Sequence, residues 1–116
     1  MKDTSKYEKD YSESGLWSKL DKFAKKIGGK LVGDALKLFY LMKSGKLNAG
    51  QKAAVIGALG YFIAIVDLIP DMLPGGFVDD AGVIAGVLKL LAEFVNAEIK
   101  SRVNVKLKEY GFEPIK

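Results

Sequence analysis

The sequence predicts an all-α protein, a small bundle of about four helices, and two observations support this prediction. Apolar residues recur at helical spacing along most of the 116 residues, and no segment shows the period-two alternation of a half-buried strand. A chain of this length builds one hydrophobic core. We expect a flexible polar N-terminal tail over residues 1–13 and a single helical domain over residues 14–116.

The first helix is expected over about residues 14–27 and the second over about residues 30–43. In the first, apolar side chains share one face and lysines occupy the other, an arrangement typical of a helix at a membrane surface. The candidates for contact with the membrane surface are Trp17, Lys19, Lys22, Phe23 and Lys26. The alternative is an ordinary amphipathic helix packed on the bundle with its lysines in water.

The third and fourth helices are expected to form a tight antiparallel hairpin, over about residues 48–68 and 79–108. Asn48 and Gln51 have the spacing of a capping box at the start of the third helix. Small residues four positions apart in both helices favour close approach of their backbones. We expect this hairpin to be the centre of the bundle, with a break near Asn96 or Asn104 left open.

The third helix carries no charge from Ala53 to Val66. These residues span roughly 21 Å as a helix, less than the ~30 Å hydrocarbon core of a bilayer. We therefore expect a buried core helix or a re-entrant one before a simple transmembrane span.

The composition limits the chemistry of any site. Cysteine and histidine are absent, which excludes thiolate chemistry and the usual imidazole base. A metal site would need oxygen ligands, hence Mg²⁺ or Ca²⁺. The net charge of +4 suits nucleic acid or an anionic membrane surface. With a single arginine and no recognisable DNA-binding motif, nucleic acid is not the expected partner.

Four aspartates surround the loop between the third and fourth helices: Asp67, Asp71, Asp79 and Asp80. Asp79 and Asp80 are suited to the start of a helix, and Asp71 to a turn. Asp67 lies at a helix C-terminus, where the dipole disfavours negative charge. Two interpretations stay open, structural hydrogen bonding or a divalent-cation site with a regulatory or hydrolytic role. No catalytic residue is predicted.

An ordered series of residues in this region resembles the signature of the bacterial YkvA-like family, the domain of unknown function 1232. The matching residues are Tyr61, Asp67, Pro70, Asp71, Pro74, Gly76, Phe77, Asp79 and Asp80. Ile65 departs from the pattern, since the family has proline there. The resemblance covers about residues 50–90. It implies a small helical bacterial protein, often membrane-associated, with no accepted activity.

The sequence thus predicts a non-enzymatic helical domain that associates with a membrane or with a partner helix, its Asp/Pro loop setting the hairpin geometry. A homodimer through the small-residue faces is a further prediction, and no small-molecule substrate is identifiable. The polar N-terminal segment lacks the apolar region of a secretory signal. We expect a cytoplasmic protein, free or held at the inner face of the cell membrane.

Overall fold

The computed structural model describes residues 5–68 and 78–114, and the side chains of residues 5, 67, 68 and 78–81 are not described. The described residues contain helices and no strand, which confirms the all-α class. In chain order the elements are η1 (Ser5–Asp10), α1 (Glu13–Ile27), α2 (Gly29–Lys43), α3 (Ala49–Leu68), α4 (Val78–Leu90), η2 (Ala92–Phe94) and α5 (Ala97–Glu109), where η denotes a 3₁₀ helix.

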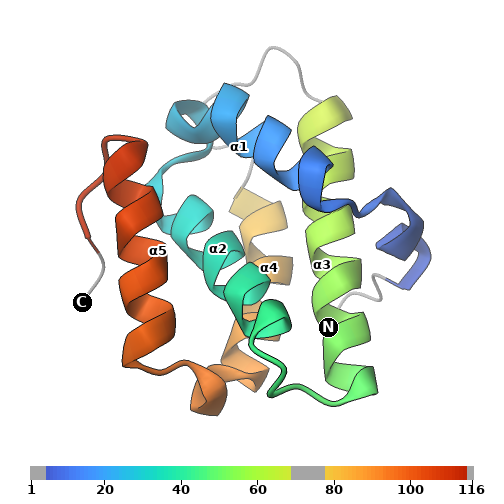
Figure 1. Cartoon of the computed structure of the whole chain (residues 1–116). Helices are drawn as coiled ribbons and strands as arrows, with labels where there is room; N and C mark the ends of the chain where they lie inside the picture. The colour runs from blue at the N-terminus through green and yellow to red at the C-terminus, as the bar shows by residue number, and fades with distance from the viewer. Residues whose placement is uncertain (1–4, 69–77, 115–116) are drawn as a thin grey trace.

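The centre of the bundle is α2, which packs against α1, α3, α4 and α5 (Figure 1). Ten of its fifteen residues are buried, as its broad apolar surface predicted. The prediction that the third and fourth helices form the centre is therefore not confirmed. Although α3 and α4 do contact each other, each also packs against α2. The position between the other helices is the one most shielded from water in a bundle of this size, and α2 occupies it.

The first three helices begin and end close to the expected residues because local signals define their ends. Ser12 caps α1, its Oγ accepting a hydrogen bond from the Gly15 N–H at 2.9 Å. Gly28, with a φ of 96°, ends α1 in a conformation that favours glycine. The capping box of α3 is confirmed. Asn48 Oδ1 accepts from the Gln51 N–H at 2.8 Å, and Gln51 Oε1 accepts from the Asn48 N–H at 3.0 Å.

The helix expected over residues 79–108 is divided, because the chain turns at η2 and continues as α5, with the break near Asn96 that the sequence left open. A straight helix of that length would measure roughly 45 Å, more than the 37 Å longest dimension of the molecule. Asn96 has an extended backbone and caps α5, its Oδ1 accepting from the Ile99 N–H at 2.9 Å. The turn lets both α4 and α5 place their apolar residues against α2.

The segment expected to be a flexible tail contains η1, which packs along α3. The Tyr7 ring meets the Tyr61 ring of α3, and both Tyr7 and Tyr11 are partly buried against the core. Gly60 has no side chain to separate α3 from the η1 backbone. Two tyrosines four residues apart therefore supply the apolar contact area that a loose tail lacks.

Candidate functional site

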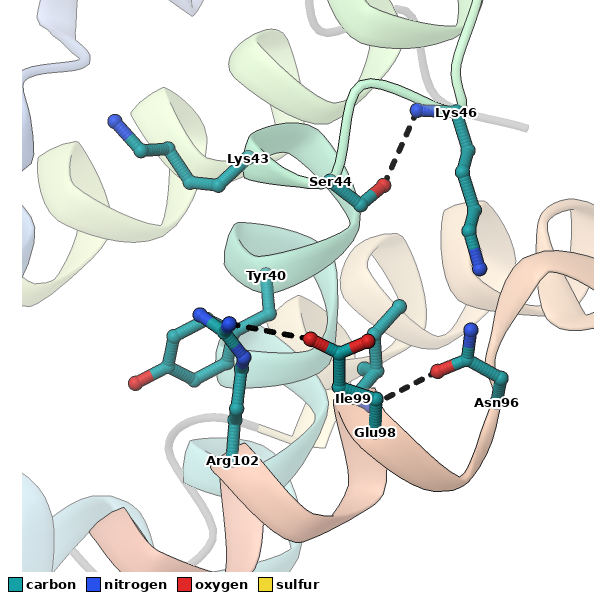
Figure 2. Close-up of a pocket in the computed structure, with 8 residues that line it drawn as sticks. All are labelled: Tyr40, Lys43, Ser44, Lys46, Asn96, Glu98, Ile99 and Arg102. Carbon is teal, nitrogen blue, oxygen red and sulfur yellow. Dashed lines mark hydrogen bonds and ion pairs between the residues drawn. The ribbon is translucent and has the colours of Figure 1, made fainter.

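A hollow of about 230 Å³ lies where the C-terminus of α2 approaches the N-terminus of α5 (Figure 2). Its lining combines three cations with hydroxyl, amide and carboxylate groups. The lining residues are Tyr40, Lys43, Ser44, Lys46, Asn96, Glu98, Ile99 and Arg102. Figure 2 shows Tyr40 and Arg102 together on one side of the hollow and Lys46 and Asn96 on the other.

Two of these polar side chains hold the helix ends in place. Ser44 Oγ donates to the Leu41 carbonyl at 2.6 Å and accepts from the Lys46 N–H at 3.2 Å. The side-chain oxygen of Asn96 caps α5. Ser44 therefore joins the last turn of α2 to the chain that follows it, and Asn96 satisfies an N–H group that α5 leaves unpaired.

Two cations of the hollow have acidic partners, one inside the hollow and one on α1 outside it. Arg102 donates to Glu98 at 3.2 Å, and Lys43 lies 3.6 Å from Glu13 of α1. Burial raises the pKa of the Tyr40 hydroxyl, although the positive charges of Lys106 and Arg102 oppose the shift. Tyr40 is therefore a protonated hydrogen-bond donor at neutral pH. The hollow can donate hydrogen bonds to a small anion.

The predicted cation site falls largely outside the described residues. Asp67 lies in the last turn of α3, and Asp79 and Asp80 lie in the first turn of α4, which begins one residue earlier than expected. Their side chains are not described, and Asp71 lies outside the described residues. The described residues hold no group of three or more potential metal-ligating side chains. A Mg²⁺ or Ca²⁺ site at these aspartates stays a prediction.

Of the remaining residues of the predicted structural motif, Tyr61 is described and the others lie outside the described residues. Tyr61 is buried in α3, with 3% of its surface exposed, and its ring contacts Tyr7. Pro70, Pro74 and Gly76 lie outside the described residues. The role of the Asp/Pro loop in setting the hairpin geometry therefore stays a prediction as well.

The structure separates the membrane-surface candidates of α1 into two groups. The Trp17 ring packs edge to face on Phe39 of α2, with centroids 5.1 Å apart, and Lys106 Nζ lies 4.9 Å from the Trp17 ring centroid. Phe23 is partly buried against the core. Lys22 and Lys26 are exposed, whereas Lys19 is half-buried. The aromatic candidates thus pack on the protein itself, and Lys22 and Lys26 face water.

One helix of the described residues, α3, is long and apolar enough to cross a membrane. Half of the apolar segment of this helix, Ala49–Val66, is buried inside the protein. η1, α1, α2 and α4 all pack against this helix. Core helices of water-soluble proteins pass the same test of length and composition, so this property gives only a weak indication of membrane association.

A second, larger hollow, which was not predicted from the sequence, lies between α2, α4, η2 and α5. Its charged residues include Lys30, Asp34 and Lys37 of α2, together with Lys89 and Lys100. The spacing of the three α2 residues could have indicated that they lie together, because residues three or four apart are neighbours on a helix. No local pattern could have placed Lys89 and Lys100 beside them.

The fold and these hollows define a small all-α domain with several cationic side chains gathered at two concave places. A family model described as "Protein of unknown function (DUF1232)" matches residues 51–86, so this segment of the chain is similar to that family. The match runs from the first turn of α3 into α4. No curated protein matches the chain, and no solved structure does.

Proposed function

We propose that this chain is a non-enzymatic domain that attaches peripherally to the anionic inner face of the cell membrane through the lysines of α1. The observation that carries the proposal is the division of α1 into two faces. Leu16 and Leu20 are fully buried in the core, whereas Lys22, Lys25 and Lys26 are exposed. These three lysines form no ion pair within the described part of the chain.

Attachment by charge, without insertion into the bilayer, agrees with the packing of the apolar residues inside the protein. The apolar face of α1 packs into the core, and α3 is covered by neighbouring elements. Placing either helix in hydrocarbon would separate it from these contacts. The resemblance to the YkvA-like family, whose members are often membrane-associated, is a second reason for choosing a membrane over a partner helix.

The strength of such attachment follows from the number of lysines. Each lysine near an anionic leaflet contributes about 1 kcal/mol, and the attraction falls off within a Debye length of about 10 Å at 0.1 M salt. Three lysines on one face therefore support reversible binding that weakens as salt concentration rises.

Flotation with vesicles tests the proposal. We expect the protein to float with vesicles that contain phosphatidylglycerol at low salt, but not with vesicles of phosphatidylcholine alone. A triple variant with Lys22→Gln, Lys25→Gln and Lys26→Gln should weaken binding about 100-fold, because three contributions of about 1 kcal/mol are lost. Failure of the unaltered protein to bind the anionic vesicles would refute the proposal.

A matched control separates the α1 face from net charge. The triple variant with Lys9→Gln, Lys52→Gln and Lys108→Gln loses the same charge from exposed positions on η1, α3 and α5. We expect it to retain most of the vesicle binding. Equal loss in the two triple variants would show that net charge alone, without the α1 face, governs attachment.

A further inference from the structure

Four lysines from three helices surround the hollow between α2, α4, η2 and α5. Lys30 and Lys37 come from α2, Lys89 from α4 and Lys100 from α5. Asp34 is the single acidic residue in the described lining. Four positive charges against one negative charge leave a formal excess of three positive charges at one concave place.

Asp34 neutralises part of this charge and is itself enclosed. Its side chain is 12% exposed, with Oδ2 3.6 Å from Lys30 Nζ and Oδ1 4.0 Å from Lys37 Nζ. The Lys30 side chain is 90% exposed, whereas that of Lys37 is only 20% exposed. The Lys37 side chain is therefore largely enclosed, and its ion-pair partner within the described residues is one carboxylate oxygen 4.0 Å away.

Lys89 and Lys100 add charge that no described acidic side chain balances. Both are exposed at the edge of the hollow, and within the described residues neither forms an ion pair. The rest of the lining is apolar, formed by Ala85, Leu88, Ala92 and Val95. Low-dielectric walls strengthen the attraction between cations and a bound anion and concentrate anions at a cleft.

We propose that this hollow is a binding site for the phosphate group of a small phosphate ester, contacted by Lys37, Lys89 and Lys100. Lysine binds phosphate as a point charge, and three lysines are more than enough to neutralise the charge of about −2 on a phosphate monoester. The volume of about 400 Å³ lies in the range of small-molecule sites, roughly 300–1,000 Å³. The hollow at the α2 C-terminus, with about 230 Å³, is smaller than that range.

The lining also limits what the ester carries. The described lining has no aromatic ring on which a nucleobase could stack, and its apolar part consists of short aliphatic side chains. A glycerol or acyl-glycerol substituent fits this chemistry better than a nucleoside. Such a group occurs both in soluble glycerol phosphates and in the headgroup of phosphatidic acid. The site does not use Lys22, Lys25 or Lys26, so it is independent of the proposed membrane attachment.

Calorimetric titration of the full chain with glycerol 3-phosphate, at constant ionic strength and in a phosphate-free buffer, tests the site. We expect saturable binding that the double variant Lys89→Gln and Lys100→Gln weakens about 30-fold, through loss of two contacts between unit charges at the protein surface. Both lysines are exposed, so the variant should fold normally, which its circular dichroism and melting temperature will show.

The double variant Lys9→Gln and Lys52→Gln is the matched control, with the same loss of charge from exposed positions on η1 and α3. It should bind glycerol 3-phosphate as the unaltered protein does. Equal weakening by the two double variants, or no effect of the Lys89 and Lys100 changes, would overturn the proposal.

Vesicles of phosphatidylcholine with phosphatidic acid form the lipid arm of the experiment. Binding of glycerol 3-phosphate that depends on Lys89 and Lys100 identifies a soluble ester as sufficient. Binding confined to phosphatidic acid vesicles, with the same dependence, identifies the lipid headgroup. If neither probe binds in a manner that depends on these lysines, the hollow is not a phosphate site, whatever the α1 variants show for membrane attachment.

Discussion

The rings of Tyr7 and Tyr61 meet edge to face, with centroids 4.8 Å apart and an interplanar angle of 75°. Tyr61 lies in the segment that the family model matches, whereas Tyr7 belongs to η1, outside it. Aromatic pairs in this geometry contribute about 0.5–1.5 kcal/mol beyond the burial of their surface. The N-terminal segment is thus joined to α3 by a specific contact.

Gly60→Ala should separate η1 from α3. A Cβ at position 60 would overlap the backbone carbonyl of Tyr7 and would lie 3.2 Å from the Tyr11 backbone nitrogen. The obstacle is backbone, which cannot move as the end of a side chain can. We expect the free energy of unfolding to fall by about 2 kcal/mol, as overpacked sites typically show. Urea denaturation measures it.

Gly82→Ala is the control for this change. Gly82 lies within α4, and no atom of the described residues lies within 4 Å of a Cβ built there. Because alanine is the better helix former, we expect Gly82→Ala to stabilise the protein by about 0.5–1 kcal/mol. If Gly60→Ala were as harmless as Gly82→Ala, the close packing of η1 on α3 would be contradicted.

Asn48→Ala should destabilise the start of α3. The substitution removes the side-chain oxygen that accepts from the Gln51 N–H at 2.8 Å. Loss of an N-cap costs about 1 kcal/mol. Chemical denaturation should show this loss, and Asn48→Asp, which keeps an acceptor at the same place, should largely avoid it. Equal stability of the alanine and aspartate variants would argue against the capping box.

Tyr110→Phe should weaken the attachment of α5 to α1. The Tyr110 hydroxyl donates to Asp21 Oδ1 at 2.8 Å, across the two helices. We expect a loss of about 1 kcal/mol in the free energy of unfolding at neutral pH, the net value of one hydrogen bond. Thermal denaturation measures the loss. The variant Asp21→Ala, which removes the acceptor, should show a similar change. The double variant should be about as stable as the less stable of the two single variants.

The stability of the protein should fall in alkali, partly because of Tyr11. Burial, with a smaller contribution from the negative charge of Glu13, raises the pKa of Tyr11 from 10.0 to about 12. Between these values the unfolded chain ionises at Tyr11 while the folded protein does not. The stabilisation from Tyr11 is therefore complete below pH 10 and is lost as pH rises toward about 12.

Denaturation at a series of pH values, together with the ultraviolet titration of tyrosinate, checks this expectation. Tyr11→Phe cannot ionise, so its stability should decline less steeply above pH 10 than that of the unaltered protein. Lysines lose charge in the same interval in both proteins, and their effect cancels in the comparison. Parallel decline in the two proteins would show that Tyr11 does not contribute.

Local signals in the sequence determined the fold class and the ends of the first three helices. Gly28 ends α1, and the pair of Asn48 and Gln51 starts α3, each through contacts within four residues along the chain. The apolar circumference of α2 likewise predicted its burial. Such signals need no knowledge of the remaining chain, so the sequence alone was enough to read them.

Only the tertiary structure decided the rest. The chain turns at η2 because two apolar helices must share α2 within a molecule shorter than their combined length, and η1 is ordered because Tyr7 meets a distant tyrosine. The hollow with Lys37 needed Lys89 and Lys100 from other helices. Each of these features depends on which surfaces meet after folding, and spacing along the chain does not record that.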